Sequence, residues 1–108
     1  MRRMVVTPII KNNICLNAHP KGLEVMVRNE IARAAREPAL FGIRNALIIG
    51  ASTGYGLASR IVAAFGAGAG TIGVASGRPP TARRTGNVGY YTTRTFETEA
   101  KKAGLYAK

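Results

Sequence analysis

The sequence predicts an α/β fold with a parallel sheet, preceded by an N-terminal β-hairpin. Two apolar runs, 45–49 and 71–75, are continuous rather than alternating, which is typical of strands covered on both faces. A glycine-rich turn and a helical pattern over 55–65 separate the two runs. This strand, turn, helix and strand order predicts a βαβ unit spanning 45–75.

The length and composition indicate one small globular domain. The chain has 108 residues, of which 46% are hydrophobic, and this content excludes a disordered tail. Its formal charge of +11 suggests a polyanionic partner: nucleic acid, a phosphorylated cofactor or an acidic membrane surface. The alternative is that a more acidic remainder of a larger protein balances the charge.

Cysteine and histidine are too few for metal or disulfide chemistry. Cys15 is the single cysteine, which excludes a disulfide framework and a cysteine zinc site, and a reducing cytoplasm fits best. His19 is the single histidine and precedes Pro20, so a structural role in a turn is expected and no metal site is predicted. No run reaches the ~18–20 uncharged apolar residues that a membrane span needs.

A hairpin and a helix are predicted before the βαβ unit. Short β-type runs at 4–7 and 14–17, with turn-forming residues at 11–13, predict a β-hairpin within 1–20. A helix is predicted within 21–38, ending before Pro38. Its apolar residues recur at spacings of three and four, which predicts one buried face made of Leu23, Val27, Ile31 and either Ala34 or Ala35.

The chain after the βαβ unit is predicted as a loop, a helix and a strand. Residues 76–91 read as a basic loop rich in Gly, Pro and Arg. Within 92–108, a helix is expected to begin at Thr92 or Thr93 and end at Lys102, and the run 105–107 starts a further strand. Two clear strands and the start of a third make an incomplete sheet, so the chain alone is expected to be marginally stable.

The turn at 50–56 has the glycine spacing G-x-x-x-G-x-G. Gly50 lets the chain turn off the strand, Gly54 leaves room for a pyrophosphate, and Gly56 lets the helix pack closely against the strand. The helix N-terminus would offer free N–H groups and partial positive charge to phosphates. The alternative is a tight turn without a ligand. The expected cofactor-binding residues here are Gly50, Ser52, Thr53, Gly54, Tyr55 and Gly56.

The end of the second strand is expected to meet the adenosine ribose through Ser76, Gly77 and Arg78. Dinucleotide sites usually place a carboxylate here, and this chain has none at that point. An arginine nearby holds the ribose 2′-phosphate of NADP in other sites, so Arg78, with Arg83 or Arg84, is a candidate for NADP selection. A solvated basic loop is the alternative, so the cofactor stays open as NADH or NADPH.

These residues give the chain a family resemblance. It resembles the N-terminal part of the trans-2-enoyl-CoA reductases, also described as FabV-type enoyl-acyl-carrier-protein reductases. The matching words, in order, are Ile14-Cys15, Ala18-His19-Pro20, Gly50-Ala51-Ser52-Thr53-Gly54-Tyr55-Gly56-Leu57-Ala58, Arg60-Ile61, Ala63-Ala64-Phe65-Gly66, Thr71, Gly73-Val74, Arg78-Pro79 and Gly104-Leu105-Tyr106-Ala107-Lys108. The resemblance implies a Rossmann-type fold and NAD(P)H-dependent reduction of enoyl thioesters on CoA or acyl carrier protein in fatty acid synthesis.

Two departures from this family are visible. The family's catalytic tyrosine has a lysine nine positions on, and Tyr90, Tyr91 and Tyr106 have none, so no catalytic residue is predicted and the chain alone is expected to be inactive. The family commonly has Glu where this chain has Gly77. Without that carboxylate, the family's usual preference for NADH is not expected to carry over to this chain.

Two other interpretations belong to different classes. The charge, with Tyr90 and Tyr91 close to several arginines, suits a small basic nucleic-acid-binding protein. Its basic residues are nevertheless spread along the chain and no recognised nucleic-acid motif occurs, which disfavours that class. The other interpretation is a nonfunctional truncated gene product.

Overall fold

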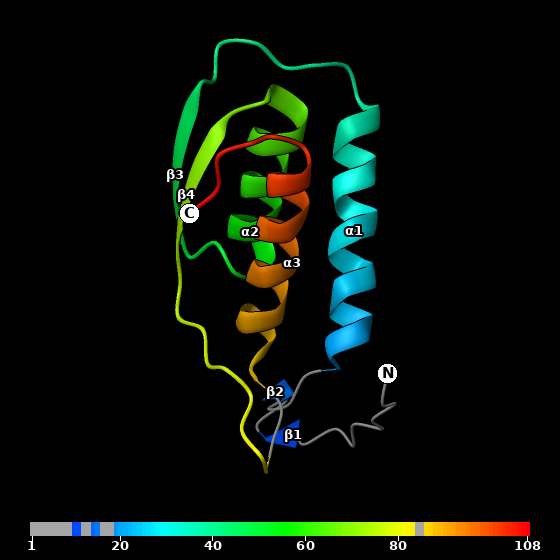
Figure 1. Ribbon diagram of the computed structural model, residues 1–108, viewed down its shortest axis with the longest axis vertical. Coiled ribbons are helices and arrows are strands. Elements are labelled where there is room, and N and C mark those ends of the chain that lie inside the picture. Colours follow the sequence, from blue (N-terminus) through cyan, green and yellow to red (C-terminus); the bar gives the residue numbers. More distant parts are fainter. Residues whose placement is uncertain (1–9, 12–13, 16–18, 84–85) are drawn as a thin grey trace.

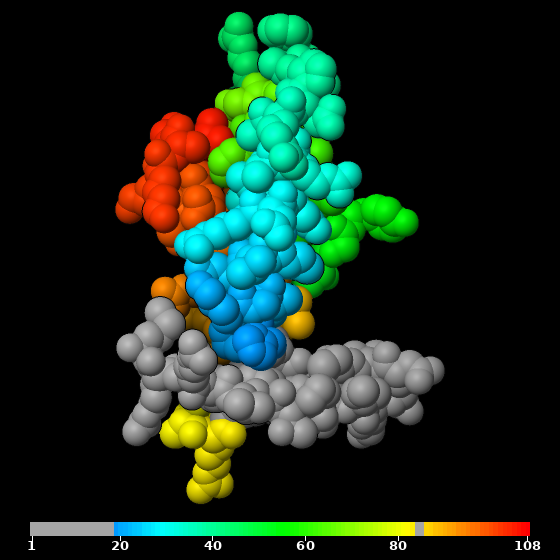
Figure 2. All heavy atoms as spheres, turned by 90° about the vertical axis from the view of Figure 1, so that its right-hand side faces the viewer, coloured from blue at the N-terminus to red at the C-terminus, as the bar shows by residue number. Residues whose placement is uncertain are grey.

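The computed structural model describes residues 10–11, 14–15, 19–83 and 86–108. Figure 1 shows β3 (Asn45–Ile49) and β4 (Gly70–Val74) along one side, α2 (Gly54–Ile61) and α3 (Val88–Lys102) in the middle, and α1 (Pro20–Arg36) outside them. In Figure 2, α1, coloured blue to cyan, faces the viewer. The elements in chain order are β1 (Ile10–Lys11), β2 (Ile14–Cys15), α1 (Pro20–Arg36), β3 (Asn45–Ile49), α2 (Gly54–Ile61), the π-helical turn η1 (Val62–Gly66), β4 (Gly70–Val74) and α3 (Val88–Lys102).

The predicted parallel sheet is present. β3 pairs with β4 in parallel, from Asn45 beside Gly70 to Ile49 beside Val74. On the other edge of β4, Ala107 forms a parallel bridge with Thr71, and the Lys108 N–H donates to the Thr71 carbonyl at 3.0 Å. The segment expected to begin a third strand thus forms one parallel bridge with β4, on the edge away from β3.

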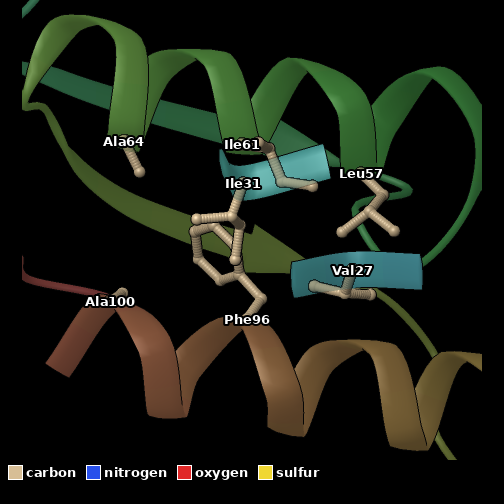
Figure 3. Packing of buried hydrophobic residues seen from close by; sticks show 7 residues of the cluster. All are labelled: Val27, Ile31, Leu57, Ile61, Ala64, Phe96 and Ala100. Atoms are coloured by element: carbon tan, nitrogen blue, oxygen red, sulfur yellow. The ribbon is translucent and has the colours of Figure 1, made fainter. Parts of the chain in front are cut away.

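One apolar core joins the three helices (Figure 3). Val27 and Ile31 project from α1 as the helical spacing predicted, and Phe96 of α3 is fully buried between α1 and α2. The ring of Phe65 meets that of Phe96 edge to face, with centroids 5.9 Å apart. The buried cluster consists of Val27, Ile31, Leu57, Ile61, Ala64, Phe96 and Ala100.

The expectation that both faces of the strands are covered is wrong for this chain. All three helices lie on one side of the sheet (Figure 1), and Leu47 and Ile49 on the other side are 65% and 79% exposed. Ile72 and Val74 of β4 are also exposed. The described residues supply no element that covers this second face. The apolar side chains of β3 and β4 on it are therefore exposed, although a continuous apolar run is typical of a strand covered on both faces.

Several predicted boundaries need correction. α3 begins at Val88, not at Thr92 or Thr93, because Asn87 caps it: its Oδ1 accepts from the Tyr90 N–H at 3.0 Å. Residues 88–91 are therefore helix rather than basic loop. The helix expected over 55–65 begins at Gly54 and finishes as a π-helical turn, and the helix expected within 21–38 begins at Pro20.

The N-terminal hairpin is present, but with other strands than expected. β1 (Ile10–Lys11) pairs antiparallel with β2 (Ile14–Cys15), so Lys11 belongs to a strand and not to the turn. The run 4–7 lies outside the described residues. Across the described part of the chain, no helix combines the length and apolar character needed to cross a membrane.

His19 has the structural role expected of it, as the N-cap of α1. Its Nδ1 accepts from the Gly22 N–H at 3.0 Å, and Pro20 takes the first helical position. We expect His19→Ala to lower the free energy of unfolding by about 1 kcal/mol. His19→Asn should lower it much less, because asparagine also caps helices well. Urea unfolding of both variants measures this, and equal losses from the two would contradict the capping role.

Candidate cofactor-binding site

The glycine turn joins the carboxyl end of β3 to α2 and is tied to the neighbouring strand. Gly50 has φ of +76°, a left-handed conformation that other residues adopt only with strain. The N–H groups of Gly50 and Ala51 both donate to the Val74 carbonyl, at 2.7 and 3.2 Å. These bonds fix the turn beside the end of β4, so the turn and the loop after β4 form one edge.

Gly54 opens α2 with φ of +57°, and a Cβ at this position would meet nothing within 4 Å. The space outside the first turn of the helix is therefore open. Thr53 is the N-cap, yet its side chain makes no capping hydrogen bond. The first N–H groups of α2 are consequently available to an external acceptor, the arrangement in which helix N-termini bind anions.

Gly56 is required by close packing. A Cβ at Gly56 would lie 1.9 Å from the carbonyl oxygen of Gly50, far inside any allowed contact. The close approach predicted for this glycine is therefore present, although its neighbour is the backbone of the turn rather than the strand.

α3 brings the two loops of this edge together. A Cβ at Gly89, near the start of α3, would lie 2.8 Å from Ser52 Oγ and 3.1 Å from the Ser76 carbonyl oxygen. The hydroxyl of Thr92 donates to the Ser52 carbonyl oxygen. The N-terminal end of α3 thus contacts both the glycine turn and the loop after β4. The predicted residues Ser52 and Ser76 therefore both lie beside Gly89.

A cavity of about 260 Å³ lies beside the carboxyl end of β4. Ser76 and Gly77 line it, as does Ala51 of the glycine turn. Its full set of described lining residues is Ala51, Arg60, Gly73, Ala75, Ser76, Gly77, Gly89, Tyr90, Thr93 and Arg94.

Arg78 is not one of these lining residues. Its backbone exchanges two hydrogen bonds with Asn87: the Arg78 N–H donates to Asn87 Oδ1 at 3.0 Å, and the Asn87 N–H donates to the Arg78 carbonyl at 3.1 Å. Its Nη1 is buried without a hydrogen-bond partner in the described structure. Tyr55, by contrast, is 95% exposed beside the helix N-terminus.

Sequence reasoning missed the residues that α2 and α3 contribute to this cavity. Arg60 of α2 is only 2% exposed, and its burial lowers the pKa of its guanidinium. It donates from Nε to Thr71 Oγ1 and from Nη2 to the Lys108 carbonyl, both at 3.0 Å. Its spacing of three from Leu57 was a signal for the buried face, but an arginine on an amphipathic helix normally faces water.

A parallel βαβ unit, a glycine turn at the carboxyl edge of its sheet and an open helix N-terminus define a dinucleotide-binding domain of the Rossmann type. Comparison with known proteins agrees with this class. Residues 5–82 match the model of the NAD(P)H binding domain of trans-2-enoyl-CoA reductase, and the chain belongs to that family.

Individual relatives are substantially similar over nearly the whole chain. The enoyl-[acyl-carrier-protein] reductase [NADH] of Coxiella burnetii is 55% identical over 106 residues, covering 97% of this chain and 26% of the relative. The trans-2-enoyl-CoA reductase [NADH] of Ruminiclostridium cellulolyticum is 48% identical over 105 residues, covering 97% of this chain and 27% of the relative.

Solved structures show the same similarity. The crystal structure of Treponema denticola trans-2-enoyl-CoA reductase in complex with NAD is 42% identical, with a TM-score of 0.86, covering 97% of this chain and 28% of that one. The chain therefore spans about a quarter of the length of the relatives it matches. The interpretation as a nucleic-acid-binding protein gains no support from these relatives.

Proposed function

We propose that the chain binds NADH or NADPH as the cofactor-binding portion of a reductase that acts on trans-2-enoyl thioesters of CoA or acyl carrier protein. The observation that carries the proposal is the geometry of the glycine turn. Its backbone is forced into place by Gly50 and Gly56, while the space at Gly54 stays open in front of the first N–H groups of α2. The names of the relatives support the cofactor and the substrate class.

Each part of the edge takes one part of the cofactor in this proposal. The first N–H groups of α2 and the hydroxyls of Ser52 and Thr53 donate to the pyrophosphate oxygens. Tyr55, exposed at the same helix end, borders this site. The loop after β4, with Ser76, Gly77 and Arg78, meets the adenosine ribose.

The cofactor would supply the hydride, and this chain's residues would bind and orient it. None of its tyrosines has a lysine nine positions on, so we expect no enoyl reduction by the chain alone. A cytoplasmic location is part of the proposal, because a chain with one cysteine suits a reducing compartment.

A pair of glycine variants tests the pyrophosphate site. Gly54 and Gly68 both have positive φ, +57° and +71°, and neither would meet an atom within 4 Å as alanine. Gly54→Ala and Gly68→Ala should therefore cost similar backbone strain, about 1–2 kcal/mol. Only Gly54→Ala adds a methyl group where the pyrophosphate approaches, so only it should weaken dinucleotide binding, by about tenfold or more.

Titration calorimetry with NADH and NADPH measures these affinities, with folded fractions checked by circular dichroism. Saturable binding by the unaltered chain and by Gly68→Ala, weakened in Gly54→Ala, is the expected result. Equal losses of dinucleotide affinity in the two variants would contradict pyrophosphate binding at this turn. Absence of saturable binding by the unaltered chain would overturn the proposed function.

A further inference from the structure

The carboxyl end of β4 lacks the acidic group that selects NADH. The chain has no aspartate, and no glutamate occurs between Glu37 and Glu97. This range contains the whole βαβ unit and both loops of the candidate site. A carboxylate at the end of the second strand binds ribose hydroxyls and would repel a 2′-phosphate, so its absence leaves that position open to a phosphate.

The cavity beside this strand end offers donors instead. Ser76, Thr93 and Tyr90 bring hydroxyl groups to its lining, and no described lining residue is acidic. Its volume of about 260 Å³ is below the roughly 300–1,000 Å³ typical of sites for drug-sized ligands. The cavity therefore suits one polar group at the end of a larger ligand rather than a whole dinucleotide.

Arg60 makes the inner wall of the cavity positive. Its guanidinium donates to two neutral oxygens, Thr71 Oγ1 and the Lys108 carbonyl. Glu97 is the acidic residue that acts on its charge, yet the two form no salt bridge in the described structure. No salt bridge neutralises this buried charge in the described structure, so it adds positive potential to the cavity.

Arg94 places a second guanidinium in the lining, from α3. Its Nη1 donates to the Tyr90 hydroxyl at 2.7 Å, and its Cζ lies 5.5 Å from the centroid of the Tyr90 ring. These contacts hold the side chain while most of its N–H groups stay available. A guanidinium held in this way can donate two parallel hydrogen bonds to a phosphate.

We propose that this cavity receives the ribose 2′-phosphate of NADPH and that Arg94 determines the preference for NADPH over NADH. Arg60 adds positive potential to the cavity, and Gly77 leaves its lining without a carboxylate at the end of the strand. The inference rests on the proposed function, because it assigns one end of the same cofactor.

Gly77 provides a direct way to reverse the preference. A Cβ there would have its nearest contact at 3.6 Å, with the Tyr90 Cα, which is ordinary van der Waals distance. Gly77→Glu therefore adds a carboxylate at the cavity without a steric clash in the backbone. Gly77→Ala is the matched control, since it adds the Cβ without the charge.

The experiment compares NADPH and NADH affinities at one salt concentration for the unaltered chain and four variants. NADPH should bind about tenfold or more tightly than NADH to the unaltered chain. Arg94→Ala should lower only the NADPH affinity, by a similar factor, whereas Arg78→Ala should change the NADPH and NADH affinities by the same factor. Gly77→Glu should make NADH the tighter ligand, while Gly77→Ala keeps the original order.

Equal affinities for the two cofactors in the unaltered chain would overturn this inference and leave the proposed function intact. A loss of NADPH affinity in Arg78→Ala but not in Arg94→Ala would overturn the role of Arg94. Absence of saturable binding of either cofactor would overturn the proposed function and this inference together.

Discussion

Gly56→Ala is expected to leave most of the chain unfolded at room temperature. The added methyl carbon would lie 1.9 Å from the Gly50 carbonyl oxygen and 2.7 Å from its carbonyl carbon. Both are backbone atoms, so no side-chain rotation relieves the clash. Either the start of α2 or the turn must move, and the turn is held by the hydrogen bond from Gly50 to Val74.

The expected loss exceeds the ~1–3 kcal/mol typical of overpacked side chains, because backbone has to shift. A domain has only about 5–15 kcal/mol of stability in total, and a small one with an uncovered sheet face lies toward the low end. Thermal and urea unfolding, followed by circular dichroism, measure the loss.

Gly66→Ala is the matched control for Gly56→Ala. Its Cβ would lie 3.6 Å from the Val62 Cγ1, an ordinary contact, and it also lies in a helical segment. Alanine in place of a helical glycine should raise the free energy of unfolding by up to about 1 kcal/mol. Similar unfolding midpoints for the two variants would contradict the close approach at Gly56.

The features predicted correctly from the sequence are those that local chemistry dictates. A turn that needs left-handed backbone and close packing demands glycine, so Gly50 and Gly56 mark it in any context. The face of α1 follows from the spacing of Val27 and Ile31, because both have to reach the same core. These predictions depend on neighbours within one or two helical turns.

The features that the sequence did not reveal depend on distant contacts. The exposure of Leu47 and Ile49 reflects which elements the chain supplies, not the composition of β3 itself. Gly89 and Tyr90 line a cavity with Ser76 and Gly77 because α3 begins four residues earlier than the first expected start, at Thr92. The Asn87 cap was the local signal that could have placed that start correctly.

Arg60 shows the same limit for a single side chain. An arginine on a helix is ordinarily solvated, yet Arg60 reaches Thr71 of β4 and the chain at Lys108. Its guanidinium carbon lies 4.4 Å from the centroid of the Phe96 ring. Gly73 makes the room, because a Cβ there would lie 2.4 Å from Arg60 Nη1.

Arg60→Ala is expected to lower the free energy of unfolding by about 3–5 kcal/mol. The substitution empties the space beside the Phe96 ring and removes the donors to Thr71 Oγ1 and the Lys108 carbonyl. The loss should appear first where residues 106–108 pair with β4, because Arg60 binds both. Hydrogen exchange at the Lys108 and Gly73 N–H groups, which bond across this pair, reports it directly.

Arg60→Met separates packing from hydrogen bonding. Methionine restores much of the apolar volume against Phe96 without the donors, and it also removes a buried charge that lacks an acidic partner. We therefore expect Arg60→Met to be more stable than Arg60→Ala, with hydrogen exchange near Lys108 as fast in both. Stability and exchange unchanged by Arg60→Ala would show that the contacts of Arg60 do not hold residues 106–108 on the sheet.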